Sequence, residues 1–384
     1  MKHYIYFLTG LVFLAGLLAE THAIPAFARK YSMSCKTCHA PAPKLKDYGE
    51  EFAANGFELK DKEAPRYYQD TGDDQVSLIR DFPLAMRLEG HVTYNQDQSK
   101  QSDFYAPSVV KLLSGGALSK YMSYYFYYIL EEGHTGKIED AYLMFNNIAG
   151  LELDIYLGQF QVSDPLFKRE VRLTREDYQI LKFAPSASQI NLTYDRGIMV
   201  NYSLPTGTDI FVELVNGTGI GVPGPAGTFD SDPFKNFIGR ISQDLFEGVR
   251  IGGFTYLGAE RQRFSDNGIT MFGPDLTLNA GNFELNTMYL SRTDDATMSG
   301  GSVKEIKTQG AMAELIYMPN GDDSRFYGVA VFNWIESDET WQNHRSAALH
   351  FGHVTRRNIR LVAEYGYNFT HKYPSFSMGF VSAF

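Results

Sequence analysis

Cysteine is nearly absent from this chain of 384 residues, which contains only Cys35 and Cys38. A small fold held together by several disulfides is therefore excluded. Positive charge is also scarce, because 35 Lys and Arg face 45 Asp and Glu, and the net charge of -10 argues against a nucleic-acid partner. Beyond the N-terminus, no apolar run reaches the roughly 20 residues of a membrane-spanning helix. Tyr, Phe and Gly are abundant, at 25, 28 and 35 residues, and are typical of strands and tight turns.

The first 23 residues have the layout of a secretory signal peptide. Lys2 precedes an apolar run from Ile5 to Leu18, and Thr21-His22-Ala23 places small residues at the expected cleavage site. A membrane anchor is the alternative, but the run is too short to span a bilayer as a helix. We therefore expect residues 1–23 to be removed on export.

Both cysteines belong to one five-residue motif, Cys35-Lys36-Thr37-Cys38-His39. Two thiols at this spacing can each add to a vinyl group of haem, and the following His then lies beneath the iron. The motif predicts one covalent haem c, with thioethers at Cys35 and Cys38 and with His39 as the proximal iron ligand. A Cys35–Cys38 disulfide and a zinc half-site are the alternatives. Zinc would usually need a second Cys or His pair nearby, and none occurs between residues 24 and 80.

The residues around this motif predict a small α-helical domain at 24–60. Residues 43–45 lead into an expected helix that ends near Asn55-Gly56, where Gly is a usual stop signal. Phe27 and Phe57 could complete an apolar wall around the porphyrin. Three residues at helical spacing are expected to share one apolar face: Leu45, Tyr48 and Phe52.

The sixth iron ligand is not evident from the sequence. Met33 is the single Met of the expected small domain, but it lies only two residues before Cys35. His91 and His350 are candidates from farther along the chain, since the alternation of their strands turns both toward the inside of a barrel. Met33 and His91 are therefore the two principal candidates.

From Leu84 onward, apolar and polar residues alternate with period two, as in Ile359–Phe369. Alternation alone also fits a soluble sandwich. However, about sixteen strand candidates have the length of transmembrane strands, and their connections alternate between short and long, the long ones including 163–187 and 293–305. The final strand ends on Phe384, as in bacterial outer-membrane proteins. We therefore predict an all-β fold, an antiparallel transmembrane β-barrel at 84–384, joined by an acidic linker at 61–83 to the helical monohaem domain.

The segment around the haem motif carries further specific features. It begins with Pro25-Ala26-Phe27-Ala28-Arg29 and leaves through Phe52 to Asn55-Gly56-Phe57. With the motif between them, these residues resemble the fused monohaem cytochrome c–porin family of the bacterial outer membrane, of the iron-oxidase type. The barrel resembles that family only in architecture and strand number.

The resemblance implies electron transfer between an extracellular donor or acceptor, ferrous or ferric iron above all, and a periplasmic c-type cytochrome or other carrier. It implies an outer-membrane location, with the haem domain on the periplasmic side or in the barrel lumen. The direction of electron flow stays open, and iron:cytochrome c oxidoreductase is one interpretation of the enzyme class. A diffusion porin with an accessory redox-sensing or docking cytochrome is the alternative function, and a peroxidase-like enzyme is a third.

Overall fold

The computed structural model describes residues 26–59, 68–69, 72–73, 78–79, 82–96, 101–119, 121–131, 136–224 and 227–384. The expected signal peptide at 1–23 and most of the expected linker at 61–83 lie outside the described residues. Within the linker range, β1 (Tyr68–Gln69) and β2 (Leu78–Ile79) form a two-stranded antiparallel sheet.

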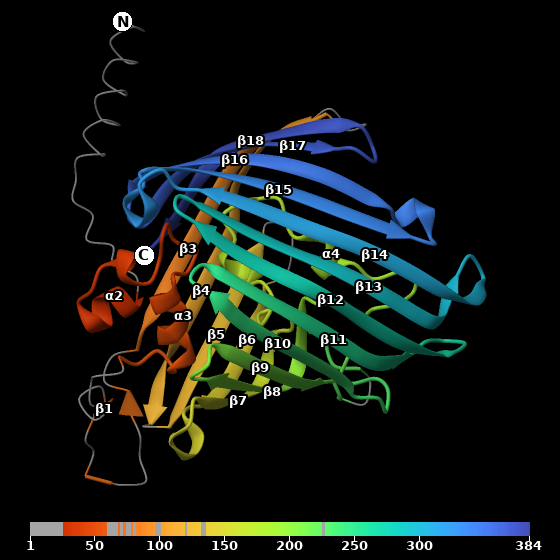
Figure 1. Cartoon of the computed structure of the whole chain (residues 1–384), viewed down its shortest axis with the longest axis horizontal. Helices are drawn as coiled ribbons and strands as arrows, with labels where there is room; N and C mark the ends of the chain where they lie inside the picture. The colour runs from red at the N-terminus through yellow and green to blue at the C-terminus, as the bar shows by residue number, and fades with distance from the viewer. Residues whose placement is uncertain are drawn as a thin grey trace, which may run out of the picture.

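Sixteen antiparallel strands close into a single barrel in sequence order, with the last strand pairing with the first (Figure 1). The predicted strand number is confirmed. The strands are β3 (Leu84–Asn95), β4 (Gln101–Ser119), β5 (Met122–Glu131), β6 (Lys137–Phe145), β7 (Leu153–Gln161), β8 (Tyr194–Leu204), β9 (Thr208–Val215), β10 (Asn236–Phe246), β11 (Val249–Arg261), β12 (Asp266–Ala280), β13 (Phe283–Ser299), β14 (Ser302–Tyr317), β15 (Phe326–Ser337), β16 (His344–Arg356), β17 (Ile359–Asn368) and β18 (Tyr373–Ala383).

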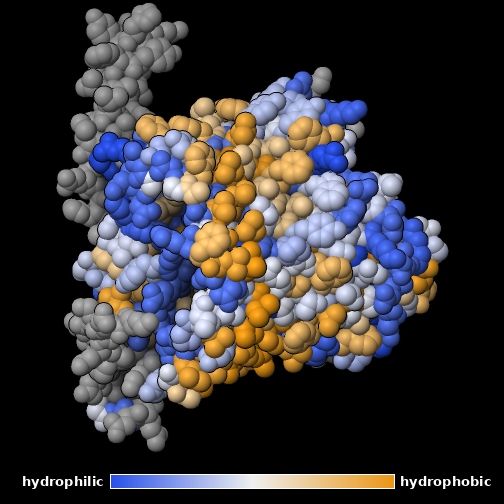
Figure 2. Space-filling model, in the orientation of Figure 1, coloured by the Kyte–Doolittle hydropathy of each residue, from blue (hydrophilic) through white to orange (hydrophobic). Residues whose placement is uncertain are grey.

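The period-two pattern separates the outer face of the barrel from its interior. On β17, Leu361 and Tyr365 are about half exposed, whereas Arg360 and Glu364, each one residue before them, are buried. Apolar side chains form a band across the barrel surface, between two hydrophilic ends (Figure 2). An outward apolar band of this kind suits the hydrocarbon of a membrane. None of the helices in the described part of the chain is long and apolar enough to cross a bilayer.

The C-terminal residue takes part in closing the barrel. The Phe384 N–H donates to the Met86 carbonyl at 2.8 Å, and the Met86 N–H donates to the Phe384 carbonyl at 2.6 Å. Because β3 and β18 meet at this seam, the terminal Phe extends the pairing of the closing strand by one residue.

Two expected long connections differ in the structure. Residues 293–305 are almost wholly strand, since β13 and β14 meet at a turn of Gly300 and Gly301, both with positive φ. Glycine adopts such backbone angles without steric cost. The other connection, expected at 163–187, spans residues 162–193 between β7 and β8 and folds into the lumen instead of lying outside. It contains η4 (Arg169–Val171) and α4 (Gln179–Lys182).

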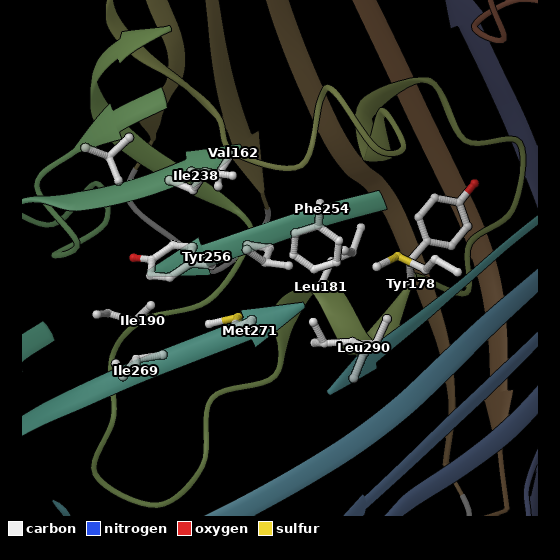
Figure 3. Close-up of a cluster of buried hydrophobic side chains, with 14 of the residues drawn as sticks. Val162, Tyr178, Leu181, Ile190, Ile238, Phe254, Tyr256, Ile269, Met271 and Leu290 are labelled. Atoms are coloured by element: carbon white, nitrogen blue, oxygen red, sulfur yellow. The ribbon is translucent and has the colours of Figure 1, made fainter. Parts of the chain in front are cut away.

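The lumen loop, residues 162–193, packs against inward side chains of the strands. Ile180 and Leu181 are almost completely buried, and they share one apolar cluster with Met271 and Leu290 of β12 and β13 (Figure 3). Apolar burial of this extent stabilises the loop inside the barrel. A plug of this kind fits a barrel of sixteen strands, whose lumen is otherwise wide enough for water.

The N-terminal segment, residues 26–59, lies at the barrel end that also holds the C-terminus (Figure 1). It comprises α2 (Ala26–Tyr31), η1 (Cys35–Thr37) and α3 (Asp47–Ala54). As expected, α3 stops before Asn55-Gly56, and Gly56 has a φ of 68°. The expected apolar face is wrong in part, because Leu45 precedes the helix and Tyr48 is 43% exposed. Three further 3-10 helices lie in barrel connections: η3 (Ile148–Gly150), η5 (Gly321–Asp323) and η6 (Thr340–Gln342).

Candidate haem site

The Cys-x-x-Cys-His motif forms one tight turn, which precedes α3 in the chain. Ser34 caps it, because the Lys36 N–H donates to the Ser34 hydroxyl at 3.3 Å. The His39 N–H donates to the Cys35 carbonyl at 2.9 Å, which closes the turn. Both cysteines are free thiols, not joined in a disulfide, and burial raises the pKa of each.

The imidazole of His39 is oriented by the backbone that follows it. Its Nδ1 lies 2.9 Å from the Pro43 carbonyl oxygen, so Nδ1 carries the proton and Nε2 is left as the free ligand atom. Burial lowers the pKa of His39, and the positive charges of Arg360 and Arg87 lower it further. A neutral imidazole with a free Nε2 is the form that binds haem iron.

Helix α3 packs directly on the motif at Gly49. A Cβ atom at Gly49 would lie 2.3 Å from the Cys38 carbonyl oxygen, so only glycine permits this approach. The Lys46 N–H, at the start of the helix, donates to the same carbonyl at 2.9 Å. Gly49 therefore has a packing role beside the second cysteine.

An aromatic wall lies next to the motif. The rings of Phe27 and Phe57 stack at 4.9 Å, and Phe52 meets both edge to face. Phe57 also stacks on Tyr125 of β5 at 5.4 Å. The expected wall of Phe27 and Phe57 is thus present, and it continues into the barrel interior.

One cavity of about 290 Å³ joins these parts. Cys35, Cys38 and His39 line it on one side, together with the aromatic wall. Inward side chains of β3 to β6, β17 and β18 line the other side, and the lumen loop contributes Lys168 and Glu170. Its size is near the lower end of the range of small-molecule sites, about 300–1,000 Å³.

Ion pairs fix the N-terminal segment on the barrel mouth. Lys44 pairs with Glu284 of β13 at 2.7 Å, and both side chains are largely buried. Glu50 of α3 pairs with Lys168 of the lumen loop at 2.9 Å. Two more pairs connect the haem motif region with η5, namely Lys36 with Asp323 and Lys46 with Asp322.

The structure separates the candidate sixth ligands. Met33 lines the cavity together with His39. His91 points inward from β3, as its alternation predicts, but it is not among the cavity residues, and its Nδ1 lies 3.1 Å from the Ser108 hydroxyl. His350 is also inward, and its Nδ1 lies 3.0 Å from Glu364. Among these three, the geometry brings only Met33 to the motif.

Several charged groups of the barrel wall line the cavity, and sequence analysis did not assign two arginines among them to the site. These are Arg87 of β3 and Arg360 of β17. The alternation of both strands gives their inward direction, but only the barrel's closure shows that they meet the N-terminal segment. In the described part of the chain, no group of three or more His, Cys, Asp or Glu side chains is arranged to hold a metal ion.

No protein-family model matches the chain, and no curated protein matches it. Many solved structures are similar in fold. The OmpF of Salmonella typhi, solved in complex with daunomycin, has a TM-score of 0.60 at 9% identity and covers 79% of this chain and 97% of its own. OmpT of Vibrio cholerae (a loop L8 deletion mutant) has a TM-score of 0.56 at 10% identity, with coverages of 79% and 99%.

The outer membrane channel DcaP of Acinetobacter baumannii has a TM-score of 0.55 at 13% identity and covers 79% of this chain and 97% of its own. At such low identities the likeness concerns the fold alone. The chain therefore has the sixteen-stranded barrel architecture of outer-membrane porins, with residues 26–59 seated at its mouth.

Proposed function

We propose that the protein is an outer-membrane cytochrome–porin fusion that carries electrons through one covalent haem c. The electrons pass between an extracellular donor or acceptor, with ferrous or ferric iron as the first candidate, and a periplasmic carrier such as a c-type cytochrome. One observation carries the proposal: two free thiols and an oriented imidazole at haem-motif spacing line one cavity with the inward wall of a barrel.

The residues at the cavity fit a haem. Cys35 and Cys38 would hold it through thioethers, and His39 would bind the iron through the free Nε2. Met33 is the candidate for the opposite side of the iron. When bound, the haem supplies a reversible one-electron couple. The protein's own residues orient the axial imidazole, exclude water with the aromatic wall, and hold the group at the mouth.

The apolar band on the outer face and the fold likeness to porins support insertion into the outer membrane. Short turns face the periplasm in such barrels. The N-terminal segment lies beside the short connections, including the turn at 281–282, so the haem would face the periplasm. An electron carrier could then reach the haem from the periplasmic side.

A redox titration of the purified protein, with ferrous iron as the donor, tests the central proposal. We expect a haem-staining band on a denaturing gel and reduction of the haem by ferrous iron. Cys35→Ala with Cys38→Ala is the matched variant, and a haem-staining band in that variant would contradict the site. In intact cells, reduction of the haem by a donor too large to enter a pore would show access from outside.

A diffusion porin with an accessory cytochrome is the second candidate, and the porin-like fold favours it. The two functions differ in conductance. The lumen loop and its apolar cluster narrow the pore, so an electron conduit is expected to show low ionic conductance in a planar bilayer. A conductance typical of open porins, together with no haem reduction from outside, would favour the diffusion porin.

A further inference from the structure

Arg360 is the most unusual charged group at the cavity. It is 2% exposed, and among the described residues no carboxylate forms an ion pair with it; the Glu89 carboxylate, which pairs with Arg87, acts on it only at longer range. Its Nη1 donates to the Tyr327 hydroxyl at 2.5 Å, and its Nε has no hydrogen-bond partner. A buried guanidinium without a directly paired counter-ion is strongly unfavourable, so this group fits an anion that occupies the cavity.

The other cations that line the cavity are already paired. Lys111 lies 2.6 Å from Glu170, and Lys168 lies 2.9 Å from Glu50. Arg87 contacts Glu89 at 2.6 Å, yet its Nε also lacks a partner. Among the cations that line the cavity, an Nε donor without a partner therefore remains on Arg360 of β17 and on Arg87 of β3. In the closed barrel β18 alone separates these two strands.

The ligand chemistry follows from the group that the motif would bind. A haem carries two propionate carboxylates on the edge opposite the vinyl groups that react with the cysteines. Arginine binds carboxylates well, because its planar fork donates several hydrogen bonds in a fixed geometry. Arg357, in the turn beside Cys35, also lines the cavity, but it pairs with Asp323 at 3.5 Å. Arg87 and Arg360 project inward from their strands.

We propose that Arg360 and Arg87 of the barrel wall bind the propionate carboxylates of the haem. This proposal rests on the proposed function, because it needs a haem on Cys35 and Cys38. It makes the haem site composite: the N-terminal segment supplies the covalent and axial bonds, and the barrel supplies the anion partners. The haem then holds the segment and the barrel together, in addition to the ion pairs of the mouth.

The test compares Arg360→Gln with Arg172→Gln in the full-length, haem-loaded protein. Arg172 is also an arginine inside the barrel, but it does not line the cavity. Both variants lose one positive charge. Resonance Raman spectroscopy reports the propionate bending mode, and spectroelectrochemistry reports the midpoint potential.

We expect the bending mode to shift in Arg360→Gln and to stay unchanged in Arg172→Gln. The loss of a cation beside the haem disfavours the ferrous form. The midpoint potential should therefore fall by the equivalent of a tenfold change in the ferric–ferrous equilibrium, about 59 mV for one electron. The midpoint potential should fall less in the control variant, Arg172→Gln.

An unchanged bending mode in Arg360→Gln, with the haem still attached, would overturn the inference and leave the proposed function intact. A wild-type protein without haem staining would overturn both. If Arg360→Gln no longer gives the heat-modifiable band of a folded barrel, the Arg360→Lys variant is tested in its place. Lys keeps the charge but lacks the fork, so a shifted mode with a nearly unchanged potential supports the proposal, and an unchanged mode contradicts it.

Discussion

Gly49→Ala gives a sharp test of how the haem motif is built. The new methyl carbon would lie 2.3 Å from the Cys38 carbonyl oxygen, against 3.4 Å or more for ordinary contacts, and that oxygen belongs to the backbone. Helix α3 would have to move by about 1 Å, and overpacking of this kind costs about 1–3 kcal/mol. Because backbone cannot yield as a side chain can, we expect the upper half of this range. At 1.4 kcal/mol per factor of ten, the population with α3 docked on the motif falls about 30- to 150-fold relative to the undocked form.

Limited proteolysis of the folded protein measures this change. Cleavage within Asp47–Ala54 follows the population of the open segment when opening is fast, while the barrel itself resists. We expect the cleavage rate to rise by one to two orders of magnitude and covalent haem content to fall. Gly221→Ala is the control, since a Cβ atom there meets nothing within 4 Å. Equal cleavage rates and equal haem contents in the two variants would refute the packing argument.

Three other predictions address the cofactor and the barrel. Cys35→Ala combined with Cys38→Ala should abolish haem staining on a denaturing gel while the barrel still shows heat-modifiable migration. Met33→Ala should change the low-spin haem spectrum, whereas His91→Ala should not, because only Met33 lines the cavity; a spectral change in His91→Ala alone would reverse the assignment. Deletion of Phe384 removes two backbone hydrogen bonds at the seam and should lower the yield of the folded, heat-modifiable form, as seen on unheated gels.

The barrel could be predicted from the local sequence because each strand repeats one pattern, in which outward apolar residues alternate with inward polar residues. Leu361 and Tyr365 alternate with Arg360 and Glu364, and the structure places the first pair outside and the second pair inside. Sixteen repeats of this rule identify the architecture and also give the inward direction of His91. The expectation for 293–305 was wrong because a Gly-Gly pair can make a tight turn as readily as a loop.

Only part of the candidate site could be predicted from the sequence, and the covalent haem stays a prediction. Cys35, Cys38 and His39 are neighbours in sequence, so their spacing is visible without a fold. The hydrogen bond from His39 to the Pro43 carbonyl depends on the conformation of the turn, which the sequence does not show. Arg87 and Arg360 come close to the motif only because the 301 residues of 84–384 close into a barrel. The inward folding of 162–193 was missed because a long connection in such barrels is usually external. Its apolar residues, Ile180 and Leu181 among them, were the available signal.

The lumen loop bears directly on the choice between the two candidate functions. Solute diffusion needs a continuous polar, water-filled interior, which open porins have. Here Ile180 and Leu181 of the loop meet Met271 and Leu290 of the wall in a buried apolar cluster. The same loop places Glu170 at the cavity beside the Cys-x-x-Cys-His motif. An electron needs no water-filled path, and an apolar partition limits leakage of ions beside it. A lumen loop that narrows the pore therefore fits the proposed electron transfer, with a haem at the barrel mouth, better than it fits free passage of solutes.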